Sequence, residues 1–248
     1  FIYRQPEDNK IEKNLCDFNK KLCEIFKKIK EYDTIIKNFQ NPANNNFIRT
    51  AQRNFALNAN DKIENYDQYL IELIMLRIQS ETPFNILLLE QTLEIINKIS
   101  QSELDFLTCL FLKETEIVKY LKINENDSKD TLFMKLLIKF FSNGITENNK
   151  MLYVMHLNSL GILGQKGMGN YDNFEGSKIF KMFNNKEDLY IVRNLAIIKN
   201  NWKSYSNESH YIQLIGKILS LLNLTKYISF FKFNNFCELF NNFINDYK

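Results

Sequence analysis

The sequence predicts an all-α fold, a multi-helix bundle of about ten helices with a long amphipathic first helix. Three observations support this. Apolar side chains recur at steps of three and four residues along nearly the whole chain, as they do on one face of a helix. Only 7 glycines and 3 prolines occur in 248 residues, too few for the turns of an all-β protein. The polar breaks between the periodic segments carry residues that cap helices.

The first predicted helix runs from about residue 9 to residue 39. Its apolar face consists of Ile11, Leu15, Phe18, Leu22, Ile25, Ile29, Ile36 and Phe39. Asn41 and Pro42 end it, because a residue that precedes proline is pushed out of the α region. Two further helices are predicted over residues 45–58 and 63–78.

Capping residues set the start of the next two helices. Thr82 is predicted to be an N-cap with Pro83 as the first helical residue, where its missing N–H leaves no bond unmade. This helix reaches Ile99. Ser100 and Glu103 then have the spacing of a capping box, which predicts another helix after them.

The second half of the chain contains a glycine-rich segment. Four of the seven glycines fall between Gly161 and Gly169, which predicts a loop. We therefore expect an N-terminal helical bundle over residues 1–160 and a C-terminal helical part over 161–248, packed as one continuous domain. The helices predicted here cover residues 128–141, 146–161, 173–183, 209–222 and 234–247. Residues 187–203 fit either a helix or a short strand.

Charge and cysteine content limit the possible functions. The 32 basic and 29 acidic residues leave a net charge of +3, which is small for a dedicated binder of duplex DNA. No apolar run approaches the length of a transmembrane helix, so no membrane is expected. The four cysteines form no CxxC pair, and a chain of this size needs no disulfides. These features predict a reduced, cytoplasmic protein.

The sequence contains no recognisable catalytic signature. The glycine-rich segment lacks the GxxxxGK[ST] pattern of a phosphate-binding loop, because Lys166 precedes Gly167 and no hydroxyl follows. The two histidines, His156 and His210, have no neighbours at zinc-ligand spacing. We therefore predict no catalytic residue, no metal site and no cofactor.

Three charged residues stand on or beside apolar helix faces: Arg53, Glu72 and Arg77. Arg77 follows Leu73 and Ile74 by one turn, which places its guanidinium near the core. A partly buried arginine needs a partner, and a carboxylate from a neighbouring helix would supply one. The sequence leaves two alternatives, a structural salt bridge and a small-ligand site between helices.

Two segments are candidate interaction surfaces. The C-terminal aromatic residues Phe233, Phe236, Phe240, Phe243 and Tyr247 are spaced by three and four residues. This spacing fits core packing or a helix–helix dimer seam. The first helix is rich in lysine but also carries acidic residues, so it fits a solvated face, a partner surface or, as an alternative, a nucleic-acid-binding or nuclease surface.

Several segments resemble a known family. They are Phe47 to Arg53, Tyr69 to Ile74 with Arg77, Leu89 to Ser100, Glu103 to Leu107 and His156 to Gly161. Together they are similar to an uncharacterised, all-helical bacterial family that is distantly similar to the alpha-type abortive-infection proteins found among phage-defence genes. The resemblance implies an all-helical fold, a role in defence and a polar segment before Phe1. It carries over no catalytic residue.

From these observations we predict a non-enzymatic helical sensor, adaptor or oligomerising module. Its expected partner is a protein or a second copy of the chain.

Overall fold

The structure is a computed structural model that describes residues 6–27, 37–38, 40–58, 63–122, 128–142, 145–165, 174–175, 177–205 and 210–247. These residues form eleven α-helices, three short 3₁₀ helices and two three-residue strands, which confirms the all-α prediction. The chain divides into two compact units, residues 1–101 (unit 1) and 102–248 (unit 2). The boundary predicted between residues 160 and 161 falls inside unit 2.

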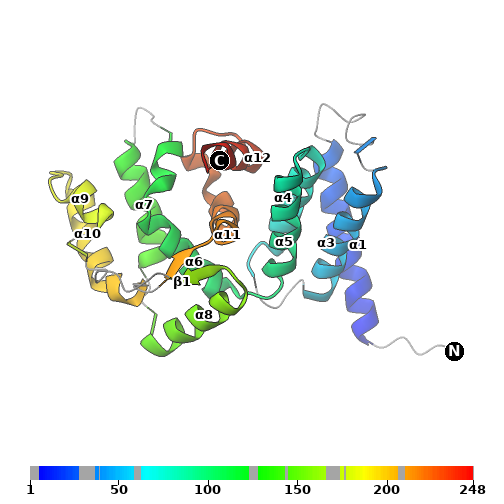
Figure 1. Ribbon diagram of the computed structural model, residues 1–248, viewed down its shortest axis with the longest axis horizontal. Coiled ribbons are helices and arrows are strands. Elements are labelled where there is room, and N and C mark those ends of the chain that lie inside the picture. Colours follow the sequence, from blue (N-terminus) through cyan, green and yellow to red (C-terminus); the bar gives the residue numbers. More distant parts are fainter. Residues whose placement is uncertain are drawn as a thin grey trace. The chain divides into compact units, whose positions relative to one another are not determined.

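Four of the helices formed by the described residues of unit 1 lie side by side (Figure 1). They are α1 (Pro6–Lys27), α3 (Pro42–Asn58), α4 (Tyr66–Gln79) and α5 (Pro83–Ile96). Neighbours in this order pack against each other. Ten of the fourteen residues of α4 are buried, because α4 lies between α3 and α5 and its sequence is apolar on nearly every side.

The boundaries of these helices follow their capping residues. Helix α1 starts at Pro6, three residues before the predicted start, and residues 28–36 of the predicted first helix lie outside the described residues. Pro42 is the first residue of α3, where its fixed φ suits a helix start. The predicted cap of α5 is confirmed, since Thr82 Oγ1 accepts a hydrogen bond from the Asn85 N–H at 3.3 Å.

Unit 2 is built around two largely buried helices. Nine of the thirteen residues of α6 and nine of the eleven residues of α11 are buried. The elements of the unit are α6 (Gln101–Lys113), η1 (Glu116–Tyr120), α7 (Lys129–Phe141), α8 (Glu147–Ser159), β1 (Leu163–Gln165), α9 (Lys178–Phe183), α10 (Leu189–Asn201), η2 (Trp202–Tyr205), β2 (His210–Ile212), α11 (Leu214–Leu224), η3 (Thr225–Phe230) and α12 (Phe236–Tyr247).

One segment of unit 2 differs from the sequence prediction. Another segment was left open between helix and strand, and the structure shows which it is. The helix predicted from residue 209 begins only at Leu214, because residues 210–212 form β2, antiparallel to β1 with Leu163 opposite Ile212. The side chains of Leu163 and Ile212 are both buried, so this strand pair packs against the core of the unit. The segment left undecided over residues 187–203 is helical. Its N-cap is Asp188, whose Oδ1 accepts a hydrogen bond from the Tyr190 N–H at 2.8 Å.

Gly216 of α11 lies close to the residues around the two strands. A Cβ atom added there would lie 2.6 Å from Ile212 Cγ2 and 2.8 Å from Ile162 Cγ2, and both isoleucines are buried. We expect Gly216→Ala to lower the free energy of unfolding by about 1–3 kcal/mol, although alanine favours helix, because overpacking outweighs propensity. Thermal unfolding followed by circular dichroism checks this. An unchanged or raised Tm would contradict the close approach.

Candidate functional site

Arg77 is the buried charge that the sequence singled out. It lies on α4 with 4% of its surface exposed. Its Nη1 donates to Asn44 Oδ1 of α3 at 2.5 Å, and its Nη2 lies 3.9 Å from Glu90 Oε1 of α5. Burial lowers the pKa of Arg77, and the Glu90 carboxylate partly opposes this. Arg77 thus joins three helices of unit 1, as in the structural alternative.

Glu72 and Arg53 do not join this cluster. Arg53 is exposed on α3. Glu72 is half-buried on α4, and it makes no hydrogen bond or ion pair to another described residue. Burial raises the pKa of Glu72 from 4.5 to about 7. A small-ligand site would require an Arg77 that has no partner in the free protein, whereas Arg77 contacts Asn44 and Glu90.

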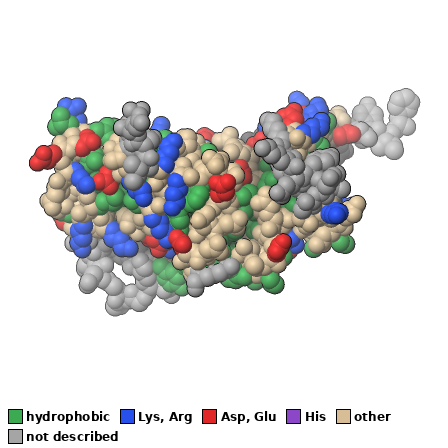
Figure 2. Space-filling model, turned by 90° about the horizontal axis from the view of Figure 1, so that it is seen from above, with side chains coloured by type: hydrophobic (Ala, Val, Ile, Leu, Met, Phe, Trp, Pro, Cys, Tyr) green, Lys and Arg blue, Asp and Glu red, His purple; other side chains and the backbone are tan. Residues whose placement is uncertain are grey.

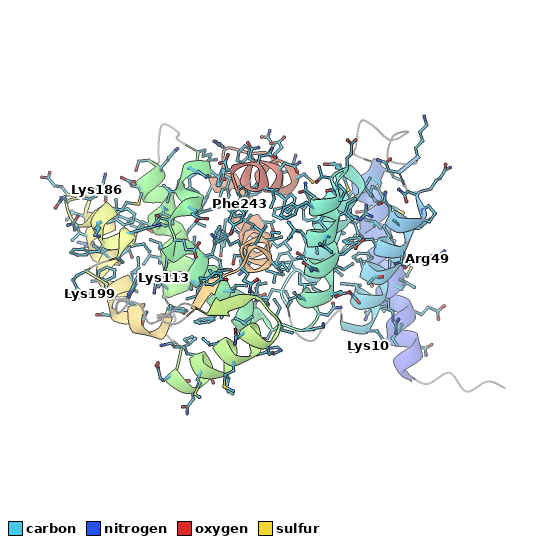
Figure 3. The ribbon with its side chains drawn as sticks, viewed as in Figure 1. Lys10, Arg49, Lys113, Lys186, Lys199 and Phe243 are labelled. Carbon is cyan, nitrogen blue, oxygen red and sulfur yellow. The ribbon has the colours of Figure 1, made fainter. Side chains whose placement is uncertain are left out.

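The C-terminal aromatic residues lie mainly inside unit 2. Phe236, Phe240 and Phe243 are at most 2% exposed. Phe243, labelled in Figure 3, meets the ring of Phe111 edge-on with 5.9 Å between ring centres. The sequence left core packing and a dimer seam as alternatives for these residues. In the single chain, these three residues pack in the core. Phe233 is half-buried, and Tyr247 is 48% exposed.

The lysines of α1 are balanced by acidic residues. Residues 6–27 contain five lysines and five carboxylates. Lys21 pairs with Asp67 at the start of α4. A surface with balanced charges gives little of the electrostatic attraction that nucleic-acid binding requires.

A histidine–carboxylate pair was not predicted. His156 Nδ1 on α8 lies 2.5 Å from Glu103 Oε1 on α6. Glu103 is buried, while the histidine side chain is 41% exposed. Such a carboxylate orients the imidazole ring. No group of three or more metal-ligating side chains occurs in the described part of the chain. Because the two residues are 53 positions apart on separate helices, no spacing in the sequence could reveal the pair.

Two helices of unit 2 expose large apolar side chains. On α8 these are Met151, Leu152 and Met155, each exposed by 59% or more. On α10 they are Leu189, Tyr190, Val192 and Ile197. Isolated apolar residues are common on protein surfaces, but several together on one helix face mark a contact surface.

The comparisons with known proteins identify a family but no activity. A model of an uncharacterised protein family matches residues 3–214, which include elements of both units. The chain belongs to this family. The match ends at the start of α11, so nearly all of α11, η3 and α12 lie beyond it. No curated protein and no solved structure matches the chain.

One further property concerns membranes. Among the described residues, no helix combines the length and the apolar character needed to cross a bilayer.

Proposed function

We propose that this protein is a non-enzymatic interaction module that associates with a second copy of itself through α10. The supporting observation is that α10 carries large apolar side chains on its exposed side as well as on its buried side. Ile191 and Ile198 are buried in unit 2, where α10 packs against α7. Leu189, Val192 and Ile197 are 69%, 49% and 39% exposed.

The exposed apolar residues of α10 share one face. Leu189, Val192, Ala196 and Ile197 follow the i, i+3, i+7, i+8 spacing of a single helical stripe. A helix that is apolar on both sides is normally covered on both sides. The described residues of the single chain leave this side of α10 exposed, which supports an interface there.

The charges of α10 favour a second copy as the occupant. Glu187 and Asp188 stand at its N-terminus, and Arg193 and Lys199 stand farther along. If two copies of α10 packed antiparallel, the acidic end of each would approach the basic half of the other. Lys199, labelled in Figure 3, forms an ion pair with Glu175 at 2.8 Å, and both side chains are exposed. Lys199 can therefore exchange Glu175 for a carboxylate of the second copy at little cost in free energy.

Two other observations support a proposed biological setting for this association. The resemblance to alpha-type abortive-infection proteins supports a role in bacterial defence against phage. None of the four cysteines, all of which the structure describes, forms a disulfide bond, which supports a reducing, cytoplasmic environment.

The oligomeric state tests this proposal. We expect size-exclusion chromatography with light scattering to give a dimeric mass that declines on dilution, because an interface of one helix face is small and therefore weak. The double substitution Leu189→Glu with Val192→Glu is expected to give a monomer, since it places four carboxylates in the symmetric interface.

A matched control is Asn245→Glu, an exposed position on α12, another helix of the unit. This variant should keep the dimeric mass. A wild-type protein that stays monomeric at all concentrations, or a double variant that keeps the wild-type mass, would show that the proposal is wrong.

A further inference from the structure

Unit 2 carries a hollow of about 620 Å³ beside the isolated bridge between Leu121 and Phe231. Its lining includes three lysines and, besides Leu121, three further apolar residues. These are Lys122, Lys129, Lys232, Ile228, Phe231 and Phe233. The volume lies within the range of small-ligand sites.

The backbone explains why the lysines meet here. Leu121 and Phe231 pair in the antiparallel bridge and are buried. Since side chains alternate between the two faces of an extended chain, the next residues, Lys122 and Lys232, lie on the other face. Lys129 is the first residue of α7, a helix of 13 residues whose N-terminal dipole also favours negative charge. Figure 2 shows Lys and Arg side chains lying in a band on the face of this unit seen from above.

None of these three lysines has an ion pair with a described residue. The carboxylates of η1, α7 and α12, the elements around the hollow, make their direct contacts with other groups, and Asp246 attracts Lys232 only from a distance, while η3 has no carboxylate. Asp130 forms an ion pair with Lys186 at 2.6 Å, and Asp246 forms one with Lys119 at 2.7 Å. Glu116 forms an ion pair with Lys217 at 3.0 Å. Glu238 accepts a hydrogen bond from the Asn234 N–H at 3.0 Å. Glu125 and Asp127 of the neighbouring segment lie outside the described residues.

This arrangement favours an anion. Lys122 and Lys129 are half-buried, and a partly desolvated ammonium group without a carboxylate is stabilised by any anion that reaches it.

The aromatic side of the hollow narrows the class of anion. Phe233 is half-buried, and Lys232 Nζ lies 5.2 Å from the centre of its ring. An aromatic face next to ammonium groups is the combination that holds a base by stacking and its phosphate by charge.

We propose that this hollow binds a nucleotide, with phosphate oxygens on Lys122, Lys129 and Lys232 and the base against Phe233. A free nucleotide and a nucleotide within a single strand share this chemistry. The site is separate from α10, so the proposal stands apart from self-association.

Calorimetric titration of the full chain at low salt tests the proposal. The probes are ATP, tripolyphosphate and an oligothymidylate of about ten nucleotides. We expect saturable binding that weakens as salt is raised. Lys122→Gln, Lys129→Gln and Lys232→Gln should each weaken binding about tenfold, the usual effect of losing one charge-assisted hydrogen bond. Phe233→Leu should weaken the binding of ATP but not that of tripolyphosphate.

The matched control is Lys139→Gln, an exposed lysine near the other end of α7, which should bind like the wild type. Tighter binding of ATP identifies the free nucleotide as the ligand, and tighter binding of the oligonucleotide identifies the single strand. Three results would overturn the proposal. The first is that neither ATP nor the oligonucleotide binds. The others are that Lys139→Gln weakens binding as much as the three lysine variants do, or that those three variants bind like the wild type.

Discussion

Replacing Arg77 with alanine is expected to lower the free energy of unfolding by about 3 kcal/mol. The substitution removes a large buried side chain between α3, α4 and α5 and leaves a cavity. It also leaves Asn44 Oδ1 without the donor that it now accepts from at 2.5 Å, and Asn44 is itself buried. The loss of attraction to Glu90 adds little, because that carboxylate is half exposed and 3.9 Å away.

Urea unfolding of Arg77→Ala and Arg77→Met separates these contributions. Methionine fills much of the space but cannot donate to Asn44, so we expect it to be less destabilising than alanine. Asn44→Ala should then change stability less in the Met background than in the wild type, because the two side chains are coupled. An Arg77→Ala protein with wild-type stability would contradict the structural role and would return Arg77 to the ligand alternative.

The sequence predicted the helices and their caps well because both depend on local physics. The three- and four-residue spacing of apolar side chains is visible in one segment at a time, and so is a cap such as Thr82. Arg77 was placed near the core by the same spacing. Its partners were not identified, because Asn44 and Glu90 come from other helices and carry no pattern of their own.

The features that escaped the sequence depend on contacts between distant segments. The pairing of β1 with β2 joins two three-residue strands, too short to give an alternating pattern. Lys217 lies buried inside α11, where Glu114 at 2.7 Å and Glu116 at 3.0 Å face its ammonium group from about a hundred residues away. Such pairs form only when the fold brings their helices together.

The C-terminal aromatic residues show a different limit. Their heptad-like spacing correctly indicates an apolar helix face, but a core face and a dimer seam have the same spacing. Only burial distinguishes them, and Phe236, Phe240 and Phe243 are buried within the single chain. The exposed apolar residues of α10 were missed for another reason, since apolar residues also lie on its buried side and its segment fitted either a helix or a short strand.

Glu72 is expected to make the protein less stable as the pH rises from about 4.5 to about 7. Burial raises the pKa of its carboxyl in the folded chain to about 7, while the unfolded chain keeps a value near 4.5. Within this interval the folded state binds the proton more tightly, so each increase in pH favours unfolding. Below the interval the carboxyl is neutral in both states and carries no penalty. Above it, the folded protein holds a half-buried charge without a described partner.

Glu72→Gln removes this titration. We expect the variant to be more stable than the wild type at about pH 8, by roughly 2–3 kcal/mol, and to lose that advantage at about pH 4.5. Urea unfolding at the two pH values measures the difference. Glu94→Gln, at an exposed position on α5, is the control and should keep the wild-type dependence on pH. If Glu72→Gln destabilised the protein equally at both pH values, Glu72 would instead be ionised and paired in the folded state, because only a favourable contact of the carboxylate would be lost with it.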